Sequence, residues 1–344
     1  MTIIINDGLH VLRAFAALEK SRREQQVEEL RKRVQQTPVS EEVLNRLSQL
    51  HPDDFAEVIG CHRGFKAQSQ IESLRAGLEN FRISCRDLQS RIADFSAYHP
   101  QRRTRTAELR REQIVAAVRK EIFATSTSAI ALDGYSSVIK KLLTDEVYEL
   151  RRKEIFDEGQ ERFIRALRNC LSHELFVQPD WRVTYKGVQK QSAFEFRTAN
   201  LLRISRKFTQ EARSYIERAG STIDVATLFQ DYAARVNRFY EWADFEIESR
   251  IPTEVEDYRR CLQLQKACAF RLSYGLFLNI WIQRKADPYN YLRDYLDDSE
   301  LEEVNRLPQK SKAQVDRIIQ LLDTRGACDE ELRALVYRLF QVES

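Results

Sequence analysis

The chain has 344 residues, enough for two or three domains, and 43% of them are hydrophobic, so it can bury substantial cores. Its ten glycines and seven prolines are too few for the frequent turns of a β-sandwich or a Rossmann-type fold, so the composition predicts an all-α protein. The net charge of +3, from 55 basic and 52 acidic residues, neither requires nor excludes nucleic acid as a partner.

The six cysteines include no C-x-x-C pair and no zinc-type spacing with a histidine, which predicts free, reduced thiols. The sequence shows no signal-peptide pattern, and no apolar run approaches the ~20 residues of a membrane-spanning helix. We therefore expect a soluble, cytoplasmic protein with no membrane partner.

The first hundred residues are predicted to form an N-terminal helical region. Apolar residues recur at helical spacing in four stretches, which are residues 9–36, a short segment after residue 40, the segment around residues 55–59, and residues 67–97. Ser40 is expected to cap the second helix, and Asp53 or Asp54 the third. The strongly basic segment 101–106 then marks the first predicted domain boundary. It is either a loop that contacts phosphate or the solvated start of the next helix.

Residues 101–250 are predicted to form a second helical domain. Helices are expected at residues 109–124, 128–143, 146–175, 193–219 and 225–249. Thr125-Ser126-Thr127-Ser128 is interpreted as a turn, and the alternation in residues 181–185 predicts a short extended segment or hairpin. The aromatic residues of the last helix are expected in the core rather than as platforms for stacking bases.

Residues 251–344 are predicted to form a C-terminal helical region that begins after Ile251-Pro252. The apolar density of residues 272–282 predicts that this part of a long helix is buried on several sides. The acidic segments 297–300 and 329–331 are interpreted as helix starts, because they lack the glycine and the spacing of a calcium-binding loop.

One segment combines residue types that can do chemistry: Arg168-Asn169-Cys170-Leu171-Ser172-His173, at the end of a predicted amphipathic helix. Asn169 and His173 are four residues apart and share a helix face, so the amide can hydrogen-bond one ring nitrogen. Arg168 and His173 lie about 140° apart around an ideal helix. For both to act on one small group, the helix must loosen near His173, or a second chain must supply another copy.

Arginine and histidine together suit the cleavage of a phosphodiester by its own 2′-hydroxyl. The planar guanidinium binds phosphate and stabilises the charged transition state, while the imidazole takes or gives a proton near neutral pH. This reaction requires no metal ion. The alternative is that the arginine, the asparagine and the histidine only cap and hydrogen-bond a helix end.

The spacing by itself is not unique, because Arg46 and His51 repeat it. A leucine follows Arg46, and His51 precedes a proline at a helix end. We interpret His51 as a cap or surface residue, so the residue after the arginine and the surrounding helices must distinguish the two segments.

The segment 163–173 resembles the signature of the HEPN (higher eukaryotes and prokaryotes nucleotide-binding) superfamily: an arginine, a polar residue and then a histidine at the end of a long helix. The similarity covers roughly residues 125–250 and implies a four-helix bundle that acts as a homodimer, with two motifs facing each other across one interface. Many members are metal-independent ribonucleases of toxin–antitoxin and antiviral systems.

Carried onto this chain, the resemblance implies that Arg168 and His173 are catalytic and that Asn169 is the supporting polar residue. It implies RNA as the substrate, an antitoxin or regulatory protein as a further partner, and no cofactor or bound metal. The alternative is a helical module that binds RNA, a nucleotide or a protein without catalysis.

Overall fold

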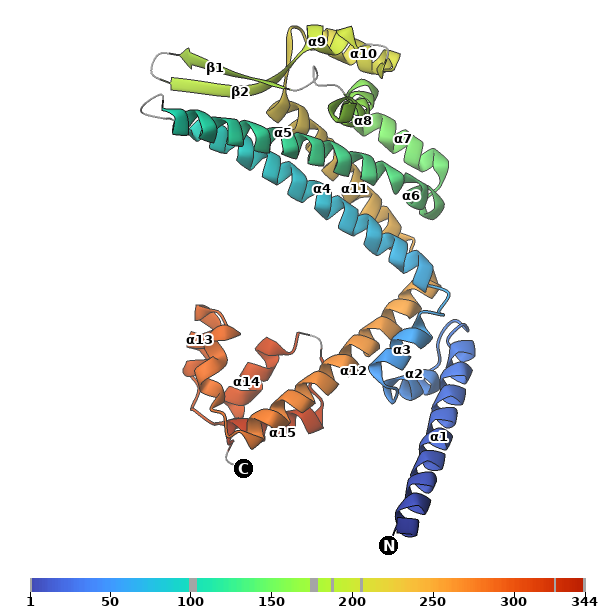
Figure 1. The fold of residues 1–344 in the computed structure, drawn as a ribbon. Helices are drawn as coiled ribbons and strands as arrows, with labels where there is room; N and C mark the ends of the chain where they lie inside the picture. The colour runs from blue at the N-terminus through green and yellow to red at the C-terminus, as the bar shows by residue number, and fades with distance from the viewer. Residues whose placement is uncertain are drawn as a thin grey trace. The chain divides into compact units, whose positions relative to one another are not determined.

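The computed structural model describes residues 2–98, 104–173, 179–186, 189–204, 207–324 and 326–342 (Figure 1). The chain divides into two compact units. The first unit comprises Met1–Gln68 with Pro252–Ser344, and the second comprises Ser69–Ile251. Both are predominantly helical, as the composition predicts, but the second also contains a three-stranded sheet, so the expected all-α class is correct only in outline.

The N-terminal helices of the first unit pack around the first half of a long helix. These elements are α1 (Thr2–Arg33), α2 (Glu41–Ser48), α3 (Pro52–Ile59) and α12 (Thr253–Gln283). Their shared core contains Val27, Leu30, Val34, Leu47, Phe55, Tyr258 and Cys261. Ser40 caps α2 by accepting a hydrogen bond from the amide of Val43, as predicted.

The cap of α3 differs from the prediction. The ring of His51, not Asp53 or Asp54, occupies the N-cap position, and its Nδ1 accepts from the amide of Asp53 at 3.4 Å. Pro52 begins the helix, so the residue before it takes the capping position. The interpretation of His51 as a cap is therefore confirmed.

A buried polar cluster joins three segments of this half. The carboxylate of Asp257 accepts hydrogen bonds from the amide of Val39 at 2.7 Å and from Nε2 of His62 at 3.3 Å. Nδ1 of the same imidazole accepts from the amide of Gly64 at 2.9 Å, so the ring is neutral with its proton on Nε2. A Cβ at Gly64 would overlap the carbonyl group of Glu254, which explains the glycine.

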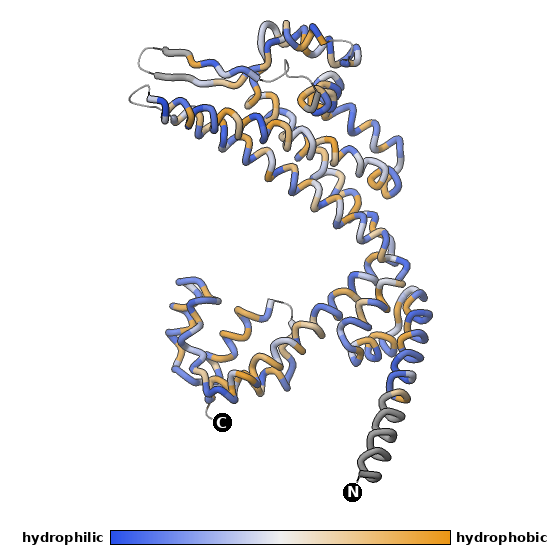
Figure 2. The backbone as a smooth tube through the Cα atoms, in the orientation of Figure 1, coloured by the Kyte–Doolittle hydropathy of each residue, from blue (hydrophilic) through white to orange (hydrophobic). Residues whose placement is uncertain are grey.

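The C-terminal half of the first unit has a separate core. The second half of α12 packs with η3 (Pro288–Asp294), α13 (Asp298–Asn305), α14 (Lys312–Leu322) and α15 (Glu330–Phe340). Asp297 forms a capping box with Glu300, and Asp329 caps α15 through the amide of Leu332. Both acidic segments are thus helix starts, as predicted. Figure 2 shows hydrophobic residues gathered along the second half of α12.

The second unit contains three long helices, five shorter ones and the sheet among its described residues. They are α4 (Phe65–Ala97), which begins in the first unit, α5 (Arg105–Gly134), α6 (Ser136–Leu142), α7 (Asp145–Ile155), α8 (Glu158–His173), β1 (Asp180–Lys186), β2 (Gln189–Arg197), α9 (Thr198–Arg203), α10 (Gln210–Arg218), β3 (Thr222–Asp224) and α11 (Val225–Ser249). The strand order is β1-β2-β3, and both pairs are antiparallel.

The predicted turn at Thr125-Ser126-Thr127-Ser128 is wrong, because α5 runs unbroken through it. Each hydroxyl donates to a carbonyl of the preceding turn, for example Thr125 to Glu121 at 2.7 Å and Ser126 to Ile122 at 2.7 Å. The hydroxyl of Thr125 also donates to the carbonyl of Ser84 on α4. These bonds satisfy the hydroxyls inside the bundle, so capping residues sit in the middle of a helix.

Two other predicted helices are divided in the structure. Residues 146–175 form α7 and α8, which are separated at Phe156-Asp157. Residues 193–219 supply the end of β2, then α9 and α10. Phe194 and Phe196 lie two residues apart on one face of β2 and are both buried, and Glu195 between them is buried on the other face. The predicted extended segment at residues 181–185 is confirmed as part of β1.

The structure groups the predicted regions 1–100, 101–250 and 251–344 differently. The first and last regions share one unit, and α4 lies with α5 in the other. The hydroxyl of Tyr98 donates to the carbonyl of Ala107, so the two helices meet beside the basic segment 101–106. That segment therefore connects two helices of one unit. Residues 101–103 lie outside the described residues.

Cysteine reactivity tests which cysteine side chains are buried in the two units. Desolvation raises the pKa of Cys85 to about 12 and that of Cys261 to about 12, whereas Cys61 is exposed. Because the thiolate is the nucleophile, we expect iodoacetamide at pH 8 to modify Cys61 in the native protein and to spare Cys85 and Cys261 until the chain is unfolded. Peptide mass spectrometry measures each site. Equal labelling of Cys61 and Cys85 in the native protein would contradict this packing.

Candidate functional site

The segment that contains Arg168 lies on α8, and contacts in its first turn fix the start of this helix. Asp157 caps it, because its carboxylate accepts from the amide of Gln160 at 2.9 Å. A Cβ at Gly159 would come within 2.8 Å of the carbonyl oxygen of Glu211 on α10. The glycine therefore allows α8 and α10 to approach closely in the first turn.

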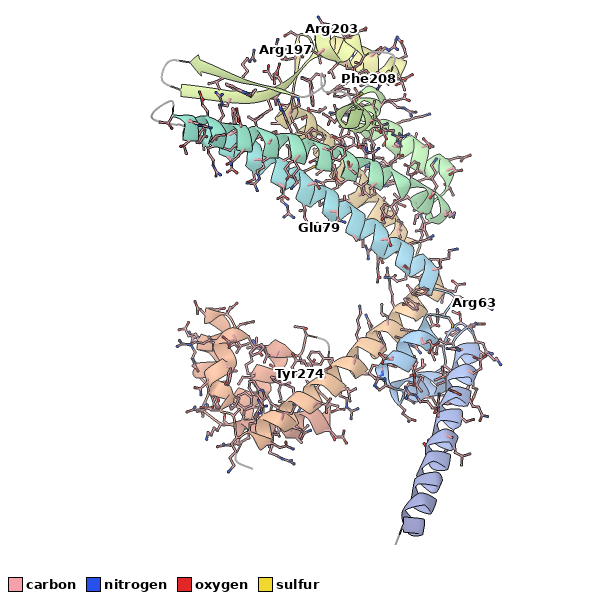
Figure 3. The ribbon with its side chains drawn as sticks, in the orientation of Figure 1. Arg63, Glu79, Arg197, Arg203, Phe208 and Tyr274 are labelled. Atoms are coloured by element: carbon pink, nitrogen blue, oxygen red, sulfur yellow. The ribbon has the colours of Figure 1, made fainter. Side chains whose placement is uncertain are left out.

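One face of α8 is fully inside the core. Phe163, Leu167 and Cys170 are each 0% exposed. The ring of Phe163 stacks on Tyr215 of α10 with centroids 5.6 Å apart, and it also contacts Phe208, which is labelled in Figure 3. This face holds α8 against α10 and the sheet, so the rotation of the helix about its axis is determined.

A chain of ion pairs fixes a second side of α8. Glu161 is buried and accepts from Arg152 of α7 at 2.6 Å, while Arg165 pairs with Asp133 of α5 at 2.8 Å. Charged hydrogen bonds of this kind are stronger than neutral ones when they are partly desolvated. Two neighbouring helices are thereby tied to the stretch of α8 that precedes Arg168.

Arg168 and Asn169 lie on the remaining side and are both exposed. Nη1 of Arg168 donates to Oδ1 of Asn169 at 3.1 Å. Both residues therefore lie off the core face of this helix. The side chain of His173 lies outside the described residues, so the predicted hydrogen bond between Asn169 and His173 stays a prediction.

The backbone of this segment is regular. The last described residue of α8 is His173, and α-helical structure continues without interruption from Glu158 to that residue. The helix therefore does not loosen before His173. In a regular helix Arg168 and His173 project about 140° apart.

The basic residues of β2, α9 and α10 differ in their exposure. Arg203, labelled in Figure 3, is exposed at the end of α9, and Arg213 is half-buried on α10. Arg206 lies outside the described residues. Arg197, also labelled, pairs with Asp180 across the sheet at 2.9 Å. An exposed ion pair of this type contributes little stability.

The aromatic residues of α11 are mainly core, as predicted. Phe229, Tyr232, Phe239 and Tyr240 are buried, whereas Phe245 is 70% exposed. Trp181 on β1 is partly exposed, and the guanidinium of Arg111 lies 4.8 Å from its ring centroid. That face of the indole is therefore already occupied by a cation.

The fold and the site define only a broad class of protein. It is predominantly helical and carries an exposed arginine–asparagine pair near the end of a packed helix. No family model matches the chain, and no match was found among curated proteins or solved structures. In the described part of the chain, no helix is long and apolar enough to cross a membrane. Among the residues that the structure describes, no three His, Cys, Asp or Glu side chains lie close enough together to hold a metal ion.

Proposed function

We propose that this protein is a metal-independent endoribonuclease of the HEPN type, with Arg168, His173 and Asn169 as its catalytic group. The observation that carries the proposal is the exposure of Arg168 and Asn169 on a helix whose opposite face is completely buried. The surrounding helices hold α8 in place, and both polar side chains reach the surface. A preorganised, accessible donor group is what phosphate recognition requires.

In the proposed reaction, the 2′-hydroxyl of the RNA attacks the adjacent phosphorus and the bond to the 5′-oxygen breaks. The imidazole of one His173 accepts the 2′-hydroxyl proton, and the protonated imidazole of the second copy's His173 gives a proton to the leaving 5′-oxygen. Arg168 stabilises the negative charge on the phosphorane-like transition state. The products are a 2′,3′-cyclic phosphate and a free 5′-hydroxyl.

The regular geometry of α8 supports a dimeric site. On an ideal helix, positions 168 and 173 are about 140° apart around the axis, so one regular helix does not bring them together. A two-fold arrangement of two α8 helices brings the arginine of one chain toward the histidine of its partner. In this proposal the enzyme acts as a toxin or antiviral effector, and an antitoxin or regulatory protein restrains it.

The test is cleavage of a mixture of structured and single-stranded RNA by the full chain in excess EDTA. We expect fragments with 2′,3′-cyclic phosphate and 5′-hydroxyl ends, identified by mass spectrometry, because the mechanism uses only protein side chains. Fragments with 5′-phosphate ends, or intact RNA, would overturn the proposal. Binding of RNA without cleavage would favour the non-catalytic module.

A further inference from the structure

The first unit exposes an unusually large apolar surface around the second half of α12. Of the sixteen large hydrophobic residues that are exposed in the described chain, eight lie here. They are Leu272, Tyr274, Leu276, Phe277, Ile280, Tyr291, Tyr295 and Leu322, each 38–60% exposed. The sequence predicts burial on several sides for this helix, yet the single chain leaves two of its sides open.

One open side is a ridge formed by Leu272, Leu276 and Ile280, which are spaced four residues apart on α12 and therefore follow one side of the helix. Leu276 is 60% exposed, and the other two are about half exposed. None of the three lines the groove of the C-terminal core. This ridge is an apolar helix face without a described covering element.

The other open side is a groove with a volume of about 410 Å³, lined by α12, η3, α14 and α15. Aromatic rings form its wall. Phe270 stacks on Tyr274 with centroids 4.0 Å apart, and Trp281 contacts both Phe277 and Tyr291 within 4.8 Å. Tyr274 is labelled in Figure 3. Ridge and groove share α12, so together they form one continuous surface.

The size of this surface indicates its occupant. Eight side chains, each about half exposed and each with roughly 150–200 Å² of surface, present on the order of 600–800 Å². The largest apolar patch on a typical monomer is about 300–600 Å². A standard protein–protein interface covers about 800 Å² on each partner. The exposed surface thus matches one half of a stable dimer interface.

Gly275 provides a second observation. It lies inside α12, where glycine costs about 1 kcal/mol of helix stability relative to alanine. Apart from its chain neighbours and the nearby backbone of its own helix, no described atom lies within 4 Å of the place where its Cβ would be. The fold of one chain therefore does not require this glycine. A second backbone that packed closely on α12 at this position would require a residue without a side chain.

We propose that α12 packs against α12 of a second copy of this chain, with Leu272, Leu276 and Ile280 at the centre of the interface and Gly275 at its margin beside Leu272. Aliphatic side chains of one copy then cover the exposed aromatic groove and ridge of the other. The inference does not rest on the proposed function, because these residues belong to the first unit and α8 belongs to the second.

The test is analytical ultracentrifugation of the full chain over a concentration series. We expect the wild-type protein to be a dimer at micromolar concentration, and the Leu272→Glu/Leu276→Glu double variant to dissociate at least ten-fold more readily. The matched control is Leu150→Glu, because Leu150 is 66% exposed on α7. The control should associate like the wild type.

Gly275→Leu keeps the test decisive if the double variant folds poorly. Its side chain enters open space in one chain and favours helix, so circular dichroism should be unchanged while dimerisation weakens at least ten-fold. A wild-type monomer at all concentrations would overturn the inference. So would a dimer that both variants leave intact, because α12 would then not form the interface.

Discussion

The His173→Ala protein is expected to cleave RNA about 10²–10⁴-fold more slowly than the wild-type chain, since positioned proton transfer contributes that much to catalysis. Arg168→Ala should lower the rate by about 10²–10³-fold, because it removes the charge that stabilises the transition state. Asn169→Ala should have a smaller effect, because this residue only supports the other two. Initial cleavage rates of a fluorescent RNA in EDTA measure all three.

His51→Ala is the matched control for this series. Arg46 and His51 repeat the arginine–histidine spacing, and His51 is exposed, but it caps α3. Its loss should lower stability by about 0.5–2 kcal/mol and leave cleavage unchanged. Equal rates for wild type and His173→Ala would remove His173 from the proposed site. Equal losses in His51→Ala and His173→Ala would show that neither measurement reports catalysis.

The Asp257→Ala variant should lose about 3–5 kcal/mol of unfolding free energy. The substitution leaves the buried amide of Val39 and the buried Nε2–H of His62 without an acceptor, and each orphaned donor costs about 1–3 kcal/mol. The loss of packing around the carboxylate adds to this cost. Urea unfolding followed by circular dichroism measures it as a lower midpoint.

Asp53→Ala is the control for Asp257→Ala. Asp53 also lies in the first unit, but its side chain is 90% exposed. We expect a change within about 0.5 kcal/mol, as for most surface substitutions. If Asp257→Ala shifts the midpoint no more than Asp53→Ala does, the buried cluster does not hold the three segments together.

Several helix starts were predictable because capping is local. Ser40, Asp297 and Asp329 each accept a hydrogen bond from an amide two or three residues ahead. Such a bond depends on a few consecutive residues and not on the rest of the fold. The sequence contains all the information that this interaction needs.

Residues 125–128 show where local rules fail. Their hydroxyls favour a turn in isolation, but in the structure they bond back to their own helix and, at Thr125, to α4. The partner on α4 is far away in sequence. The same is true of β2, because its pairing with β1 and β3 and its burial decide between strand and helix.

For the candidate site, residue type and apolar spacing sufficed to place Arg168 and Asn169 on the exposed side of α8. The ion pairs that orient this helix, such as that between Arg165 and Asp133, could not be predicted, because they join helices whose neighbours the sequence does not specify. The regular backbone as far as His173 is likewise a property of the folded unit.

The sequence by itself determined that the chain is mainly helical, where most helices begin, and which residues of α8 avoid the core, because periodicity and capping act over a few residues. Only the tertiary structure decided that Met1–Gln68 joins Pro252–Ser344, that Asp257 bonds Val39, and that the apolar half of α12 is exposed. Each of these depends on which distant surfaces pack together, and many pairings of apolar helix faces satisfy the same pattern.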